Sequence, residues 1–471
     1  MTTAIPSRPR GPPRGIGPIP QHMATIKAKR GLDLPIHGAP TSDTVVDRLD
    51  VRRVALMPQQ SWGIKVRLLA QEGDAVKVGT PLFVDRRDDG VLYCSPAAGK
   101  IAAVHRGHRR AVLSVVIDVD GFDDAEPCAT VDVAAASRDE IRAALMTSGL
   151  WPALRRRPYD KVAASTDDPA GIVVQAYDSS PLAPDLRKTI AGREDDLAIG
   201  LEALKKLTDG NIHLCAKDGE NFGKVMGGGV LVHHFDGPHP SGTAGFSMHK
   251  VCPAGANRTV WHIGIQDVCD IGQLFRSGQR PTTRVVAVTG PAAKEPKLIR
   301  TRPGADMAAL LEGESTAART RLVNGSCLWG DKIDPEQHVE FLGRWNTQVT
   351  ILEDDVKRDL VGWALPVSGR YTQTNTVWDK FFRKTFKYDT DTNGSLRAIV
   401  PMGHYEAVMP MDVLATQLIK SLASGDLEGA EKLGVLELAE EDLALCQVVD
   451  PSKIAITDML REMLTTIEKE G

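Results

Sequence analysis

The sequence of 471 residues has few cysteines and aromatic residues, and this scarcity excludes several classes of protein. Its seven cysteines are scattered, and no two form a Cys-x-x-Cys pair. A tetracysteine zinc or iron–sulfur site therefore has no local scaffold, and we predict no metal site. Aromatic residues make up 5% of the chain and the net charge is −4. Neither base stacking nor charge therefore favours a nucleic acid as a partner.

Long apolar runs and phosphate-binding motifs are also missing. No segment has the roughly 18 uncharged apolar residues that a bilayer-spanning helix needs. Residues 1–22, rich in Pro, Gly and Arg, lack the apolar run of a secretory signal, and we interpret them as a disordered extension. Neither G-x-G-x-x-G nor G-x-x-x-x-G-K-[ST] occurs. The nearest stretch, "MGGGVLVHH" at 226–234, is more typical of a loop leading into a strand than of a phosphate turn.

Residues 63–120 alternate short strand-like runs with glycine turns. Their turn pattern resembles the barrel-sandwich fold of biotinyl and lipoyl domains, in which a hairpin lysine carries the cofactor. No lysine occurs between Lys77 and Lys100, and arginine cannot replace its amine because arginine stays protonated. We therefore predict a barrel-sandwich domain over residues 23–130 that carries no swinging cofactor.

Strand and helix patterns alternate from residue 131 to residue 280, which predicts an α/β Rossmann-like domain. Ser137 begins a capping box, and Gly149 is a natural end for the helix that follows it. We expect a second amphipathic helix to end at Gly210. The acidic run "REDD" at 193–196 is interpreted as a solvated helix start.

The rest of the chain predicts three further regions: a β-grasp (SLBB-like) module over 281–345, a β-rich segment over 346–410, and a helical C-terminal region over 411–471. The predicted fold class is thus α+β multidomain. It combines a lipoyl/biotinyl-like barrel-sandwich, an α/β Rossmann-like domain, a β-grasp module and a C-terminal helical region.

Four of the twelve histidines lie within residues 233–249. Imidazoles can donate hydrogen bonds to the two carbonyl oxygens of a quinone, or ligate a metal, but no carboxylate or cysteine stands at a familiar metal-binding spacing. A surface loop, a small-molecule pocket and a metal site are the three interpretations, in that order of preference. The stretch "LMPQQSWGI" adds one aromatic candidate, for which simple packing is the preferred alternative. The candidate quinone-binding residues are His233, His234, His239, His249 and Trp62.

Four stretches resemble one protein family. They are "IKAKRGLDLPIHGAP" at 26–40, "FDGPHPSGTAGFSMH" at 235–249, "TNGSLRAIVPMGHYEAVMPMD" at 392–412 and "LGVLELAEEDLALCQVV" at 433–449. They are similar to the A component of the bacterial sodium-translocating NADH:quinone oxidoreductase (Na⁺-NQR). This resemblance implies a complex that passes electrons from NADH, through flavins and iron–sulfur centres on other subunits, to ubiquinone and exports Na⁺. It also implies a peripheral protein on the cytoplasmic face of the bacterial inner membrane, held by the partner components B to F, chiefly the membrane component B.

Relatives of that family in proton-pumping NADH dehydrogenase and Rnf-type complexes hold flavin with a glycine-rich loop and iron–sulfur centres with clustered cysteines. Here the loop is missing and the C-terminal region keeps only Cys446, whereas a cluster needs about four thiolates. We therefore expect a scaffold associated with quinone binding, with no tightly bound cofactor, no catalytic residue of its own, and ubiquinone as its ligand. Two alternatives stay open: a redox subunit that binds NADH or flavin, and a structural adaptor that never contacts quinone.

Overall fold

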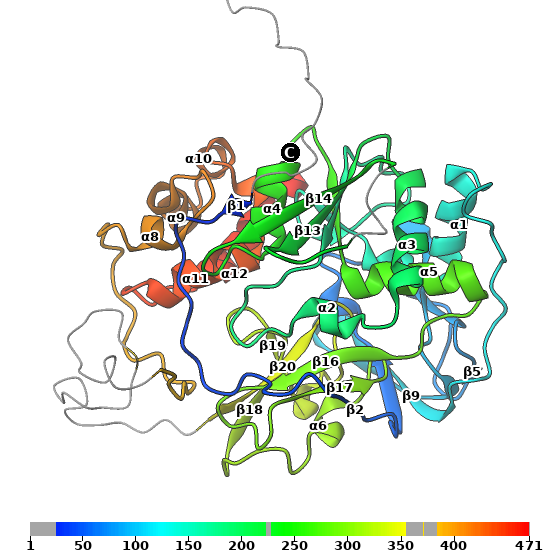
Figure 1. Cartoon of the computed structure of the whole chain (residues 1–471). Helices are drawn as coiled ribbons and strands as arrows, with labels where there is room; N and C mark the ends of the chain where they lie inside the picture. The colour runs from blue at the N-terminus through cyan, green and yellow to red at the C-terminus, as the bar shows by residue number, and fades with distance from the viewer. Residues whose placement is uncertain (1–24, 223–227, 355–370, 372–383, 471) are drawn as a thin grey trace, which may run out of the picture.

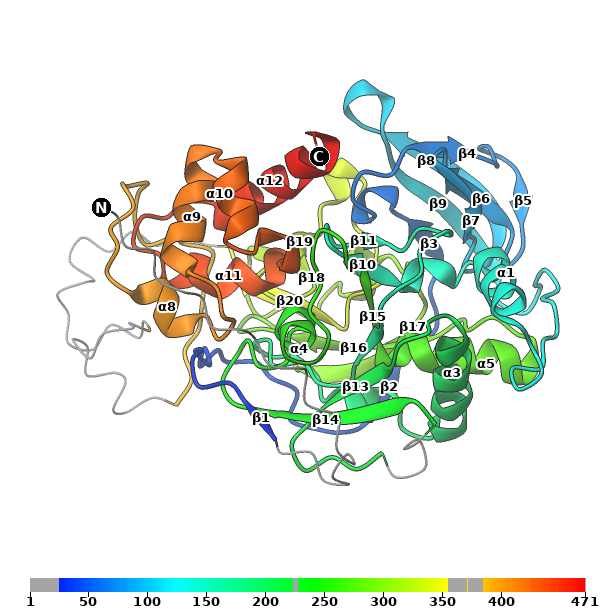
Figure 2. The same ribbon diagram turned by 90° about the horizontal axis from the view of Figure 1, so that it is seen from above.

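The strands in the described part of the chain form four sheets, which C-terminal helices flank on one side of the molecule (Figures 1 and 2). The structure is a computed structural model and describes residues 25–222, 228–354, 371 and 384–470. Among these residues, no helix combines the length and the apolar character needed to cross a bilayer.

Two small sheets share one core in the predicted barrel-sandwich region. One contains β4 (Val66–Leu68), β6 (Pro81–Asp85) and β7 (Asp88–Cys94), and the other β3 (Arg53–Leu56), β9 (Val112–Gly121), β8 (Ala98–Arg106) and β5 (Ala75–Val76). Alternating residues of these strands, such as Leu82, Ile101 and Ile117, fill the core. At the hairpin between β6 and β7, where related domains carry a lysine, Arg87 donates to the Gly63 carbonyl oxygen at 2.5 Å and to the Asp85 carboxylate. The tip is thus tied back to its own domain.

The predicted α/β region contains a seven-stranded sheet. Its order is β1 (Ile26–Lys27), β14 (Val230–Asp236), β13 (Ile212–Lys217), β12 (Ile172–Gln175), β15 (Val260–Gly264), β10 (Arg155–Arg157) and β11 (Lys161–Val162). The helices of this region are α1 (Arg138–Ser148), α2 (Leu186–Thr189), α3 (Glu194–Lys206), α4 (Ala244–Val251) and α5 (Ile265–Ser277). Helices α1, α3 and α5 share one core on one face of the sheet, whereas α4 packs in a second core on the other face. The expected capping box at Ser137 and the left-handed Gly149 are both present.

Two details of helix α3 differ from the prediction. The helix ends at Lys206, after which the Leu207 amide donates to the Leu204 carbonyl oxygen. Gly210 instead lies so close to the Ala170 carbonyl that a Cβ would come within 2.0 Å of its oxygen. The acidic start is only partly solvated, since Asp196 is buried and pairs with Arg276 at 2.7 Å. Charge patterning alone did not show that this carboxylate faces α5.

A six-stranded sheet forms the third region. Its order is β19 (Asp331–Lys332), β18 (Thr320–Asn324), β20 (Gln348–Glu353), β16 (Arg284–Thr289), β17 (Lys297–Thr301) and β2 (Val45–Asp47), with the short helix α6 (Met307–Leu310) beside it. Strand β2 comes from the N-terminal segment that the sequence grouped with the barrel-sandwich, and β1 of the same segment joins the α/β sheet instead. These short strands gain their hydrogen bonds only from distant partners, so no local pattern revealed them.

The segment predicted to be β-rich, 346–410, contains β20 but no further named strand in its described part. After residue 384 the chain is irregular until helix α8 (His404–Val408), and positions 355–370 and 372–383 of the predicted β-rich segment lie outside the described residues. This stretch pairs through isolated bridges, Phe386 with Ile36 and Asp389 with Glu353, before the turn-forming residues of "DTNGS". The helical C-terminal region follows, with α9 (Ala415–Ser424), α10 (Leu427–Lys432), α11 (Glu440–Val449) and α12 (Ile456–Glu470), and it shares its core with α4.

Candidate functional site

From β12, the crossover connections of the α/β sheet lead outward on one side to β13 and β14 and then back to β15 on the other side, so the order of the strands reverses between β12 and β15. These two strands are parallel neighbours, and β12, β13 and β14 are parallel as well. The chain leaves β12 through α2 and α3 to reach β13, and returns from β14 through α4 to reach β15 on the other side of β12. Open α/β sheets hold ligands beyond the carboxyl ends of the strands at such a point.

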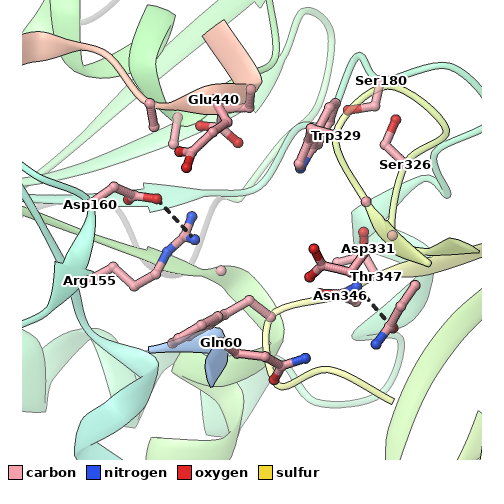
Figure 3. A pocket seen from close by; sticks show the side chains of 18 of the residues that line it. Gln60, Arg155, Asp160, Ser180, Ser326, Trp329, Asp331, Asn346, Thr347 and Glu440 are labelled. Carbon is pink, nitrogen blue, oxygen red and sulfur yellow. Dashed lines mark hydrogen bonds and ion pairs between the residues drawn. The ribbon is translucent and has the colours of Figure 1, made fainter. Parts of the chain in front are cut away.

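A cavity of about 950 Å³ lies at this position. Its walls include the carboxyl ends of β12 and β15, strand β10 with the turn after it, and the start of α4. The loops after β18 and before β20, the segment after β3, and the starts of α11 and α12 also line the cavity. Figure 3 shows Arg155, Asp160 and Glu440 on one side of the space and Trp329, Asp331 and Asn346 on the other. The volume is sufficient for a small organic ligand.

Three tryptophans give the cavity an aromatic lining. The Trp62 ring lies 4.5 Å below the guanidinium of Arg461, and the Trp345 ring lies 5.2 Å below that of Arg155. The Trp345 indole also donates to the Pro152 carbonyl oxygen at 3.1 Å, which fixes its orientation. These rings offer flat apolar surfaces on which another flat ring could stack.

The cationic side chains of the lining are all paired with carboxylates. Arg155 pairs with Asp160 at 3.3 Å, Arg284 with Asp267 at 3.0 Å, Lys332 with Asp334 at 2.8 Å, and Arg461 with Glu440 at 2.5 Å. Five further carboxyl groups line the cavity: Asp178, Asp331, Glu441, Asp458 and Glu462. The site is therefore acidic overall, and within the described lining no arginine or lysine is left over for a phosphate.

Three of those carboxyl groups hold protons more tightly than usual: Asp178, Asp331 and Glu441. Burial raises the pKa of Asp178, although the hydroxyl and amide of Ser180 donate to it. Burial, reinforced by the neighbouring Asp442, raises the pKa of Glu441 to about 7, and Arg157 opposes this shift only in part. The cavity can therefore present a neutral carboxyl group near neutral pH.

Of the candidate quinone-binding residues, Trp62 lines the cavity, and its side chain is 44% exposed. His233 and His234 are neighbours on β14 and so point to opposite faces of the sheet. The His233 ring shares a 3.0 Å hydrogen bond with the His213 ring, whereas His234 approaches the Lys217 carbonyl oxygen. Neither of these two histidines is part of the cavity lining.

The other two histidines occupy different places again. His239 is buried, interacts with the Ser179 hydroxyl at 3.1 Å, and its ring is parallel to that of Trp329, with centroids 6.3 Å apart. It therefore lies behind a cavity wall. His249 bonds the Glu437 carboxylate at 2.7 Å and accepts from the Asp412 amide, which ties α4 to the C-terminal region. The structure does not bring the four histidines together.

The sequence did not single out Trp329, Arg155 or Glu441. Trp329 follows a strand in "SCLWGD", Arg155 lies in an all-arginine strand, and Glu441 stands in an acidic helix start. Each of these patterns is typical of ordinary structure. Among the described residues, no three His, Cys, Asp or Glu side chains are arranged to hold a metal ion.

Comparisons with known proteins agree with this architecture. Three family models match in succession: the NqrA N-terminal barrel-sandwich hybrid domain over residues 26–120, the NqrA second alpha/beta domain over 136–280, and the NQRA C-terminal domain over 285–334. Among solved structures, an air-oxidized NAD⁺-reducing [NiFe]-hydrogenase aligns with 69% of this chain and 63% of its own at 13% identity and a TM-score of 0.36, which carries no functional argument.

Curated relatives match nearly the whole chain. The A component of the Na(+)-translocating NADH-quinone reductase of Hahella chejuensis is 45% identical over 450 residues, covering 95% of this chain and 100% of the relative. The corresponding proteins from Yersinia pestis and Neisseria meningitidis serogroup B are each 42% identical over 449 residues, with the same coverage. The chain therefore belongs to the NqrA family, the A components of the Na⁺-translocating NADH-quinone reductases.

Proposed function

We propose that this protein binds the head group of ubiquinone in the cavity at the carboxyl ends of β12 and β15. The observation that carries the proposal is the aromatic lining beside charges that are already paired. A quinone ring is flat and neutral, so it can stack on an indole and needs no counter-ion. The side-chain carbonyl oxygen of Gln60 accepts from the backbone amide of Arg344 at 3.2 Å. This leaves the side-chain nitrogen of Gln60 as a donor for a quinone oxygen.

The same charges disfavour the alternative ligands. NADH and flavin nucleotides carry phosphates, which proteins bind with unpaired cations or with free helix N-termini. Here the start of α5 lies beside the Asp267–Arg284 pair, and Asp442 caps α11 by accepting from the Ala439 amide at 2.9 Å. We infer a scaffold without a tightly bound cofactor, with NADH, flavins and iron–sulfur centres on the other components of the complex.

The attachment to the complex forms a second part of the proposal. We infer that the chain lies at the cytoplasmic face of the inner membrane and is held there by its partners, chiefly the membrane component B. Purifying the complex through a tag on this chain, with and without component B, tests this attachment. We expect the chain to leave the membrane fraction when component B is absent, and its retention there would contradict the proposal.

Replacement of Trp329 tests quinone binding. In the W329A variant we expect a ubiquinone analogue with one isoprene unit to bind about fivefold more weakly, since a stacked aromatic pair contributes roughly 1 kcal/mol. Isothermal titration calorimetry of the purified chain measures the change. Phe122→Ala is the matched control, because this ring packs under Arg302 at 3.8 Å and is not part of the cavity lining. Absence of saturable binding by the wild-type chain and by the complex would instead favour a structural adaptor.

The candidate histidines can be separated from the cavity in the same titration. Replacement of His233, His234 and His249 by Ala, in separate variants, asks whether quinone contacts these residues outside the cavity. His239 differs from them, because it can act through the Trp329 ring that lies parallel to its own. A loss of affinity in the His233, His234 and His249 variants, together with normal affinity in W329A, would place the quinone site at residues 233–249 and not in the cavity.

A further inference from the structure

A buried cluster of charges lies against the cavity wall, between strand β10 and the start of α11. At its centre is Arg157, whose side chain has no exposed surface. Its guanidinium bonds the Asp442 carboxylate at 2.5 Å, the Glu441 carboxylate at 3.0 Å and the Glu437 carbonyl oxygen at 2.7 Å. Asp160 completes the cluster, 3.9 Å from Arg157 and 3.3 Å from Arg155.

The cluster contains one carboxyl group more than it has cations. Asp160, Glu441 and Asp442 face two guanidinium groups, those of Arg155 and Arg157. The imidazole of His262 also contacts the cluster and bonds Asp160 at 2.9 Å, but burial lowers its pKa to about 4, so it is neutral near pH 7. An unbalanced buried charge is costly, and this cost favours a proton on one of the three carboxyl groups.

The hydrogen bonds indicate which carboxyl group carries that proton. Asp442 already accepts three hydrogen bonds, from Arg157, the Ala439 amide and the Thr243 hydroxyl, which occupy its two oxygens. Asp160 is paired with Arg155 and His262, and its pKa is lowered despite its burial. Glu441 pairs with Arg157, which it shares with Asp442, and lines the cavity. The charged groups that act on it come from α11, from β10 and from the turn after β10: Asp442, Arg155, Arg157 and Asp160.

We propose that Glu441 donates a proton to the quinone reduced in this cavity. The inference rests on the proposed quinone site. Quinone gains two electrons, which the complex supplies from NADH, and two protons to become quinol. One O–H bond of Glu441 breaks as a new O–H bond forms on a quinone oxygen, and water supplies the second proton. The carboxylate left behind is stabilised by Arg157 at 3.0 Å.

The pH dependence of quinone reduction by the whole complex tests this role. In the wild type, the rate is expected to fall as the pH rises through about 7, where Glu441 loses its proton. With Glu441→Gln in this chain, we expect the rate of quinone reduction near pH 6.5 to be roughly a hundredfold lower, which is the smallest effect usual for loss of a general acid. The rate of this variant should no longer fall as the pH rises through about 7. Glu441→Asp keeps the carboxyl group and should restore part of the rate. Glu428→Gln, on exposed α10 and paired with Lys432, is the matched control and should behave as wild type.

Calorimetric titration of the E441Q chain with the same ubiquinone analogue separates the two proposals. A dissociation constant within about threefold of the wild-type value, together with the altered pH profile of the rate, supports Glu441 as the proton donor. Normal binding with an unchanged rate and pH profile overturns the role of Glu441 as proton donor. A decrease in rate that is explained entirely by weaker quinone binding overturns it as well. If the wild-type chain and complex bind no quinone at all, the proposed site itself fails. Co-purification of the variant with its partners confirms that it is folded and assembled.

Discussion

Acidification from pH 7 to pH 4 is expected to remove several kcal/mol that four buried histidines contribute to the free energy of unfolding, because they resist protonation in the folded state. Burial lowers the pKa of His213, His233, His239 and His262 to about 4. In the unfolded chain each should titrate near its ordinary value of about 6.5. Each shift corresponds to roughly 3 kcal/mol if the histidines are independent.

The sign follows from the number of protons that each state binds. Between pH 6.5 and pH 4 the unfolded chain takes up protons on these histidines and the folded chain does not, so stability falls as the pH falls through this window. Below about pH 4 the folded chain is protonated as well, and this contribution stops growing. His213 and His233 share a hydrogen bond of 3.0 Å, so protonation of one also places a cation beside the other ring.

Urea unfolding at a series of pH values, followed by tryptophan fluorescence, measures the effect. Trp151 and Trp261 are fully buried and report on the α/β region. In the His239→Gln variant the slope of stability against pH should decrease by one proton, about 1.4 kcal/mol per pH unit at most. The exposed His108 is the matched control, and its replacement by Gln should leave the slope unchanged. Equal slopes in His239→Gln and wild type would contradict the assignment.

The buried histidines also show the limits of local sequence patterns. The four histidines within residues 233–249 were candidates for a quinone site, with a surface loop as the preferred interpretation, and the alternation of a strand sends His233 and His234 to opposite faces. The rule that separates them was available from the sequence once "VLVHHF" was read as a strand. The partner of His233 was not available, because His213 lies on the neighbouring strand twenty residues earlier.

Local signals did predict most of the regular elements. The capping box of Ser137 and Glu140 is complete, and the glycine turns of the barrel-sandwich separate the expected strands. These features depend on residues a few positions apart, where propensity and capping dominate. Strands β1 and β2 escaped prediction because two or three residues give no periodic pattern, and their partners lie far away in sequence.

The cavity was the least predictable feature. Its lining joins Trp62, Arg155, Trp329 and Glu441, which are separated by roughly 90 to 170 residues from one to the next along the sequence and come from all four regions of the fold. No motif spacing can express such an arrangement, because each short segment is also consistent with simple packing or a solvated helix start. The family resemblance pointed correctly to the complex, but it carried no residue of this site.

Replacement of Arg157 by Met is expected to destabilise the protein by about 3–5 kcal/mol, the usual cost of removing one partner from a buried ion pair. The change leaves the buried Asp442 and the cavity-lining Glu441 without the guanidinium that bonds both of them. Arg67→Met is the matched control, since Arg67 pairs with Asp89 at 3.2 Å with side chains 50% and 66% exposed. An exposed pair of this kind should change stability by no more than about 1 kcal/mol.

A second substitution distinguishes charge imbalance from lost packing. If the cost in Arg157→Met comes from the uncompensated carboxylates, adding Asp442→Asn should recover part of the stability, because the asparagine oxygen can still accept from the Ala439 amide. If the cost comes from the missing methylene and guanidinium contacts, the losses of stability caused by the two substitutions should add in the double variant. Because Arg157 also holds the Glu437 carbonyl, its loss should loosen the C-terminal helices from β10. Faster proteolysis of the C-terminal region in Arg157→Met, reversed in part by Asp442→Asn, would show that the same cluster holds the wall of the cavity in place.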